Sequence, residues 1–125
     1  MTAPSLWRRI RNSYGRSRGK RVATIDIVPD GFAFTWRGHE TRLRWADITR
    51  IDAGVRDYLF FDGFYVVVFA GATQLEIDEL DEGFQPLEYA LFERWPQIRE
   101  SWNRLLKTDP HVPQYETLWR RDEAA

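Results

Sequence analysis

The feature that most constrains the fold is a series of short apolar segments between residues 22 and 83, separated by very short turns. Several segments, such as FAFTWR, alternate apolar and polar residues with the period of a half-buried strand. Because parallel strands need crossovers of about a dozen residues or more, turns this short predict an antiparallel meander. Six strands are expected, at 22–28, 32–37, 41–45, 51–58, 64–70 and 73–80, with turns at 29–31, 38–40, 61–63, 71–72 and 81–83.

A corner is expected between the third and fourth of these strands. Trp45, Ile48 and Ile51 recur at a spacing of three, which breaks the alternation and favours one turn of 3₁₀ helix. Asp47 is suited to hold this turn, because its carboxylate can accept hydrogen bonds from nearby backbone N–H groups. Trp45 is therefore assigned to the core, where the chain passes from one strand to the next.

The spacing of apolar residues changes at residue 84. Leu87, Leu91 and Trp95 follow at intervals of four, which predicts a C-terminal helix over about residues 84–107. Pro96 interrupts this region, so it is either one kinked helix or two helices that meet there. The remainder is expected to be an extended tail that packs Leu118 back on the body.

The formal net charge of −1 hides a strong separation of charge along the chain. Residues 1–21 contain seven basic residues and no acid, so the remaining residues sum to −8. The division predicts a basic amphipathic arm with a flexible linker at 1–21, followed by a single domain at 22–125. The arm residues expected to contact a membrane or nucleic acid are Trp7, Arg8, Arg9, Arg11, Arg16, Arg18, Lys20 and Arg21.

The arm has two possible binding surfaces, a membrane and a nucleic acid, and one structural alternative. A basic amphipathic helix can lie on an anionic membrane, since each cation near the surface contributes roughly 1 kcal/mol. Contacts with nucleic acid phosphates are a weaker expectation, and binding of that kind would weaken steeply with salt. Alternatively, Leu6, Trp7 and Ile10 dock on the domain and leave the arginines in water.

The sequence contains few groups that carry chemistry, so no catalytic residue, metal site or cofactor is predicted and the chain is expected not to be an enzyme. There is no Cys, which excludes disulfides and thiolate zinc sites. His39 and His111 have no metal-ligand partners at helical spacing, and no nucleotide-binding glycine motif is present. With no long apolar run and no secretory signal, a cytoplasmic location is expected, with a peripheral membrane location as the variant the arm allows.

Two groups of residues in the body are predicted to bind a protein partner. The first brackets a strand end among aromatic residues, in the pattern typical of interface anchors, and consists of Arg56, Asp57, Tyr58 and Asp62. The second is an acidic patch suited to a basic partner, and consists of Asp78, Glu79, Asp81 and Glu82. The structural alternatives are an Arg–carboxylate pair that fixes a hairpin and a solvated strand end. An exposed edge strand is also compatible with a homodimer.

Several short motifs lie between about residue 22 and residue 121, and the last of them is a T-L-[WY]-R-R signature at 117–121. The residues of the others are Ile27 and Gly31; Leu43, Trp45, Asp47, Ile48 and Ile51; Arg56, Asp57 and Asp62; Leu75, Ile77 and Glu79; and Gly83, Phe84 and Leu87. Together these motifs resemble those of a group of small bacterial proteins with a pleckstrin-homology-like (PH-like) fold.

The resemblance implies an α+β fold, with a strongly bent antiparallel sheet of six to seven strands that forms a partly open barrel capped by a C-terminal helix. It also implies a non-catalytic module similar in size and fold to the immunity or accessory proteins encoded beside bacterial toxins. It transfers no site residues. Phosphoinositide binding is not expected, because the turn at 29–31 carries no cation.

Overall fold

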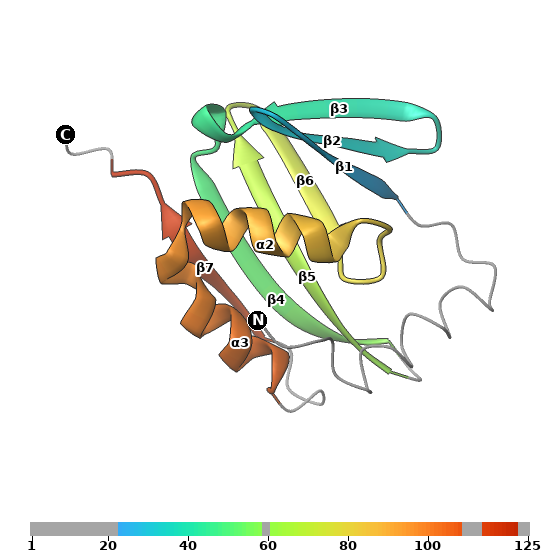
Figure 1. The fold of residues 1–125 in the computed structure, drawn as a ribbon. Helices are drawn as coiled ribbons and strands as arrows, with labels where there is room; N and C mark the ends of the chain where they lie inside the picture. Colours follow the sequence, from blue (N-terminus) through green and yellow to red (C-terminus); the bar gives the residue numbers. More distant parts are fainter. Residues whose placement is uncertain (1–22, 59–60, 109–113, 123–125) are drawn as a thin grey trace.

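Two antiparallel sheets with two helices make up the computed structural model, which describes residues 23–58, 61–108 and 114–122 (Figure 1). The first sheet has the order β1-β2-β3 and the second the order β6-β5-β4-β7. The α+β class and the antiparallel meander are thus confirmed, and the described strands close no barrel. The bounds are Thr24–Val28 (β1), Gly31–Trp36 (β2), His39–Arg44 (β3), Arg50–Tyr58 (β4), Phe61–Ala70 (β5), Thr73–Asp78 (β6) and Gln114–Arg120 (β7).

Two turns of the first sheet follow from their residue types. Gly31 opens β2 against the backbone of β3, where a Cβ would lie 1.8 Å from the carbonyl oxygen of Leu43, so only glycine fits. Arg37 and Gly38 join β2 to β3 with φ values of 52° and 81°, the two positive values of a primed hairpin turn. The turn is therefore shorter than the expected 38–40, and His39 is the first residue of β3.

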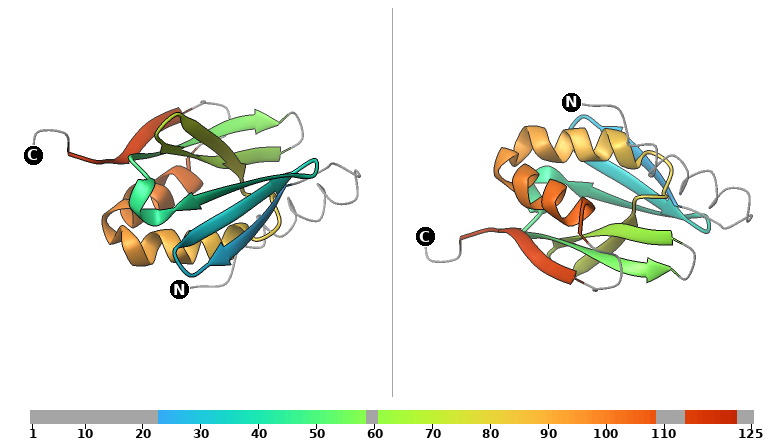
Figure 2. Two further views of the ribbon diagram at one scale, coloured as in Figure 1. Left: turned by 90° about the horizontal axis from the view of Figure 1, so that it is seen from above. Right: turned by 90° about the horizontal axis from the view of Figure 1, so that it is seen from below.

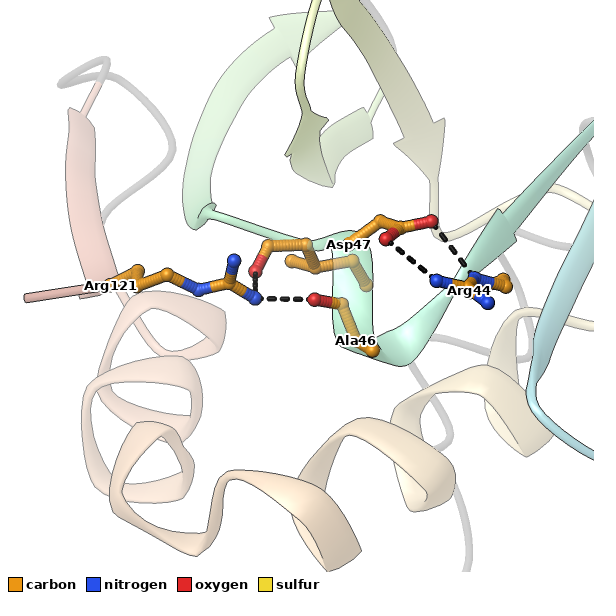
Figure 3. Close-up of polar contacts among 5 residues, drawn as sticks. Arg44, Ala46, Asp47 and Arg121 are labelled. Carbon is orange, nitrogen blue, oxygen red and sulfur yellow. Dashed lines mark hydrogen bonds and ion pairs between the residues drawn. The ribbon is translucent and has the colours of Figure 1, made fainter.

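The corner between the two sheets is a 3₁₀ turn at Trp45–Asp47, as the spacing of three predicts (Figure 3). Trp45 is 5% exposed and its ring lies 5.6 Å from that of Phe32. Asp47 pairs with the guanidinium of Arg44, at 3.0 and 3.1 Å. The C-terminal segment also reaches this corner, because Arg121 Nη2 donates to the carbonyl oxygen of Ala46 at 2.5 Å.

Three expectations about the strands differ from the structure. The predicted turn at 61–63 is wrong, because β5 begins at Phe61 and Gly63 pairs with Arg56 of β4. The predicted tail is a full strand, β7, which pairs antiparallel with β4 and shifts register at Ile51/Asp52. Instead of one bent sheet, the strands form two sheets joined through the corner.

Two helices lie between β6 and β7 in the chain. The alternative of two helices that meet at Pro96 is therefore correct, and a single helix over 84–107 is not. They are α2 (Phe84–Arg94) and α3 (Arg99–Leu106), connected by a 3₁₀ turn at Pro96–Ile98. Both lie on the same face of the four-stranded sheet (Figure 2). Within the described ranges, neither helix has the length and apolar character needed to cross a membrane.

The core lies between this sheet face, the helices and the three-stranded sheet. Its centre is Trp102 of α3, which is fully buried and lies 5.0 Å from the ring of Phe64 and 5.1 Å from that of Phe92. The indole Nε1 of Trp102 donates to the buried carboxylate of Glu88 at 2.6 Å. A buried tryptophan needs such an acceptor, and this one fixes α3 against α2.

Candidate partner-binding surface

The face of the four-stranded sheet that points away from the helices carries two groups of polar contacts, around Arg56 and around Asp52. Ile51, Ala53 and Val55 of β4 point into the core, so the alternate residues Arg50 and Arg56 lie on the opposite face. The guanidinium of Arg50 lies 4.6 Å from the ring centre of Phe69, and that of Arg56 lies 3.8 Å from Tyr65. On this outer face, therefore, two guanidinium groups make cation–π contacts with aromatic rings, and such contacts are favourable.

Arg56, one of the predicted anchors, connects this face to the acidic strand β6. Its Nη2 lies 2.9 Å from Oε1 of Glu76, and its Nη1 lies 3.3 Å from Oε2. The pair spans β5 and passes over Tyr65, which gives the arginine a fixed orientation. An Arg–carboxylate pair is thus present, but its acid comes from the neighbouring hairpin.

The predicted acidic patch divides into structural and exposed members. The carboxylate of Asp81 accepts the backbone N–H of Ala23 at 3.0 Å and that of Asp78 at 2.9 Å, which closes the turn after β6 onto the start of β1. Glu79 is 2% exposed and accepts the N–H of Phe64 at 3.0 Å, so its assignment to a solvated patch is wrong. Glu82 is exposed.

The other predicted residues are described only in part or not at all. Asp57 and Asp62 are register partners, as are Tyr58 and Phe61, so their backbones meet at the end of the β4–β5 hairpin. Their side chains lie outside the described part of the structure. So do all the arm residues from Trp7 to Arg21, and also His111. Partner binding by these residues stays a prediction.

The sequence did not indicate the most tightly bonded group on the outer face, which is centred on Asp52. Asp52 is fully buried, and its carboxylate accepts hydrogen bonds from Nε of Arg50, at 2.8 and 3.0 Å, and from Nη2, at 2.6 Å. The hydroxyl of Tyr115 on β7 also donates to it. The spacing R-x-D in a strand was a usable signal, because residues two apart share a face, but Tyr115 enters only through the unpredicted β7.

These contacts shift two pKa values in opposite directions. Burial raises the pKa of Asp52, but the hydrogen bonds from Arg50, Tyr115 and Thr117 outweigh it and leave the pKa below its usual value. Burial, together with the hydrogen bond to the charged Asp52, raises the pKa of Tyr115 to about 12. Asp52 is therefore a charged acceptor and Tyr115 a neutral donor, which holds β7 to β4.

A groove of about 650 Å³ lies where the two sheets diverge, between β2 and β6. Its apolar lining includes Phe34, Leu75 and Trp36, of which Trp36 is 46% exposed. Its polar rim carries Glu76 and Asp78.

Arg37 and Asp81 also line this groove. The guanidinium of Arg37 lies 4.4 Å from the ring centre of Trp36. The rim thus combines three carboxylates with one guanidinium, beside an exposed tryptophan. The alternation in FAFTWR puts Trp36 on the same face of β2 as Phe32, and the side chain of Trp36 is nevertheless 46% exposed at the groove.

No cluster of three or more His, Asp or Glu residues suited to a metal ion occurs in the ranges that the structure describes. His39 is exposed at the start of β3. Comparison with family models, with curated proteins and with solved structures found no match for this chain.

Proposed function

We propose that this chain is a non-catalytic binding module that engages a basic protein partner through the groove between β2 and β6. The observation that carries the proposal is the lining of that groove, in which an exposed Trp36 lies beside a rim of three carboxylates. Tryptophan and arginine are the residues most enriched among interface anchors, and Arg37 holds the indole from one side.

The PH-like identity of the fold and a role as an immunity or accessory protein beside a toxin are the finer parts of this proposal. They are supported by the motif resemblance and by the acidic body, which would suit a basic toxin or nuclease. A protein that sequesters such a partner needs surface complementarity rather than catalytic groups.

Capture from a lysate of the source cells tests the proposal. The bait is the full chain, washed at low salt and at about 0.15 M salt, where exposed charges further apart than about 8 Å are screened. We expect one stoichiometric protein partner that is retained at the higher salt. Glu76→Gln with Glu82→Gln should weaken retention. The matched pair Glu93→Gln and Glu100→Gln, which removes two exposed carboxylates from the helices, should not. Equal retention of both variants would contradict the proposal.

A second candidate function is peripheral membrane binding through residues 1–21, favoured by their seven cations without an acid. It predicts co-sedimentation of the full chain with vesicles that contain anionic lipid, and loss of it when the seven cations are changed to Gln. Neutral vesicles are the control, since they offer no charge to the arm.

A further inference from the structure

We infer that the groove between β2 and β6 is a strand-addition site, in which an extended basic segment of a partner protein pairs with the free edge of β6. The inference rests on the proposed function and gives the chemistry of its ligand. Its starting observation is the order of the four-stranded sheet, β6-β5-β4-β7, in which β6 has one strand neighbour among the described strands. Such an edge presents backbone N–H and C=O groups that another strand can bond, although at its end the N–H of Asp78 already donates to the carboxylate of Asp81.

The lining of the groove places it along this edge. Gln74, Leu75 and Glu76 are consecutive residues of β6, and all three line it. Because successive side chains of a strand point to opposite faces, a hollow lined by three in a row follows the edge rather than either face. Backbone hydrogen bonds close one end, where the N–H of Ile25 reaches the carbonyl oxygen of Glu82 at 2.7 Å.

Two of the devices that normally protect an edge strand do not occur in β6. The segment TQLEID contains no proline. Its register with β5 runs without a bulge from Tyr65↔Asp78 to Ala70↔Thr73. It does carry two acids, Glu76 and Asp78, and like charge on an opposed strand disfavours pairing with an acidic strand but not with a basic one.

The two faces of β6 define the sequence that would pair with it. On the outer face, Gln74, Glu76 and Asp78 favour cations at the opposed positions of an incoming strand, where a cation would share Glu76 with Arg56. On the inner face, partly exposed Leu75, with Phe34 and Trp36 across the groove, favours apolar residues at the alternate positions. The ligand is therefore an extended segment in which Lys or Arg alternates with an apolar residue.

A second copy of this chain fits the edge poorly. Two β6 strands paired antiparallel would bring Glu76 and Asp78 of both copies onto one face, and like charges on opposed strands are destabilising. A basic segment relieves that charge instead of doubling it.

Titration of the ¹⁵N-labelled full chain with a synthetic peptide tests the inference. The probe is a blocked peptide of alternating Arg and Val, followed by amide chemical shifts and hydrogen exchange. We expect the largest shifts and slowed exchange at Thr73–Asp78, with the indole N–H of Trp36 shifting in step. Trp36→Ser should weaken binding about tenfold, whereas Tyr89→Ser, which removes an aromatic of similar exposure (43%) from α2, should leave it unchanged.

Two control peptides separate strand pairing from charge attraction. A peptide N-methylated at every backbone nitrogen keeps its charge but cannot donate backbone hydrogen bonds, and it should not protect β6. Equal binding of this peptide, or shifts confined to residues outside the groove, would overturn the inference. So would shifts of the β6 amides that depend on protein concentration alone, because a second copy would then fill the edge.

The proposed function and this inference fail in different ways. If a protein partner is captured at moderate salt and its capture depends on Trp36, but the peptide does not protect the β6 amides, the groove binds its partner in another way and only the inference is overturned. If no protein is captured, or if capture is insensitive to Trp36→Ser, the proposed function itself fails.

Discussion

At the scale of single residues, Asp52 shows how a charge is held on the face of a sheet without exposure to water. A buried carboxylate is strongly unfavourable unless it is paired and hydrogen-bonded. Here Arg50 supplies the countercharge from the same strand, and Tyr115 adds a donor from the strand next to it. The arrangement makes Asp52 an attachment point for β7, which returns to the sheet after both helices.

The pH dependence of stability reports on this contact between Tyr115 and Asp52. The pKa of Tyr115 in the folded state, about 12, lies above its unfolded value of about 10, so its contribution to stability is complete below about pH 10 and is lost as the pH rises toward 12. The pKa of Asp52 is lowered, so its contribution is present above about pH 4 and is lost on acidification below that value.

We therefore expect one of the five tyrosines to ionise late in an ultraviolet titration of tyrosinate. Tyr115→Phe should remove that late component, and Asp52→Asn should shift it toward about pH 10, since the charged acceptor is gone. If the late component survives in Tyr115→Phe, it belongs to another tyrosine and the account of this cluster is wrong.

At the scale of elements, the turn before α2 depends on a glycine that no other residue replaces well. Gly83 has φ of 91°, and a Cβ there would lie 2.1 Å from the carbonyl oxygen of Ile25. Gly71 also has a positive φ, of 60°, but has open space around it. Both glycines thus have a positive φ, but only at Gly83 would an added Cβ clash with a neighbouring atom.

Gly83→Ala should lower the free energy of unfolding by about 2 kcal/mol or more, and Gly71→Ala by about 1 kcal/mol, since only the first adds a clash to the backbone strain. Urea unfolding of the two variants beside the wild type measures the difference. Equal losses would mean that the start of β1 is not held tightly against the turn after β6.

Arg121 is a second element-scale contact, because it ties the end of the chain to the corner between the sheets (Figure 3). Arg121→Ala should lower the free energy of unfolding by about 1 kcal/mol, which is the net value of hydrogen bonds to partly exposed carbonyl groups. Arg120→Ala removes the same charge from the adjacent exposed residue and should have little effect. A larger loss for Arg120→Ala in urea unfolding would contradict this role.

The elements that the sequence predicted well are those fixed by local chemistry. The Pro29-Asp30 turn, the 3₁₀ corner at Trp45 and the interruption at Pro96 each depend on residues close together in the chain. The turn at 61–63 was misplaced because Asp62-Gly63 is a typical turn pair, yet the β4–β5 pairing continues to Tyr58 and Phe61.

What the sequence could not supply were contacts between distant segments. The pairing of β7 with β4 joins residues that are far apart in the chain. The burial of Glu79 depends on its contact with Phe64, on the other strand of the β5–β6 hairpin. Part of the groove rim was predicted, in Asp78 and Asp81. Trp36 and Arg37 were not predicted as site residues, since the alternation in FAFTWR indicates a half-buried strand and not a groove.

At the scale of the whole molecule, positive and negative charge are concentrated in two different parts of the chain. Residues 1–21 carry only positive charge, and the groove rim between β2 and β6 is mainly negative. The two proposed functions use different parts of the chain, so substitutions in one part should abolish one function and leave the other intact. The groove is the part that the structure describes, and the central claim is that it holds a protein partner.

The most direct test is retention of a captured partner by full-length wild type, Trp36→Ser and Tyr89→Ser at about 0.15 M salt. Both substitutions remove an exposed aromatic, but only Trp36 lines the groove. The account predicts that wild type and Tyr89→Ser retain the same stoichiometric protein and that Trp36→Ser loses most of it. Equal retention by all three proteins would show that the groove does not bind the partner.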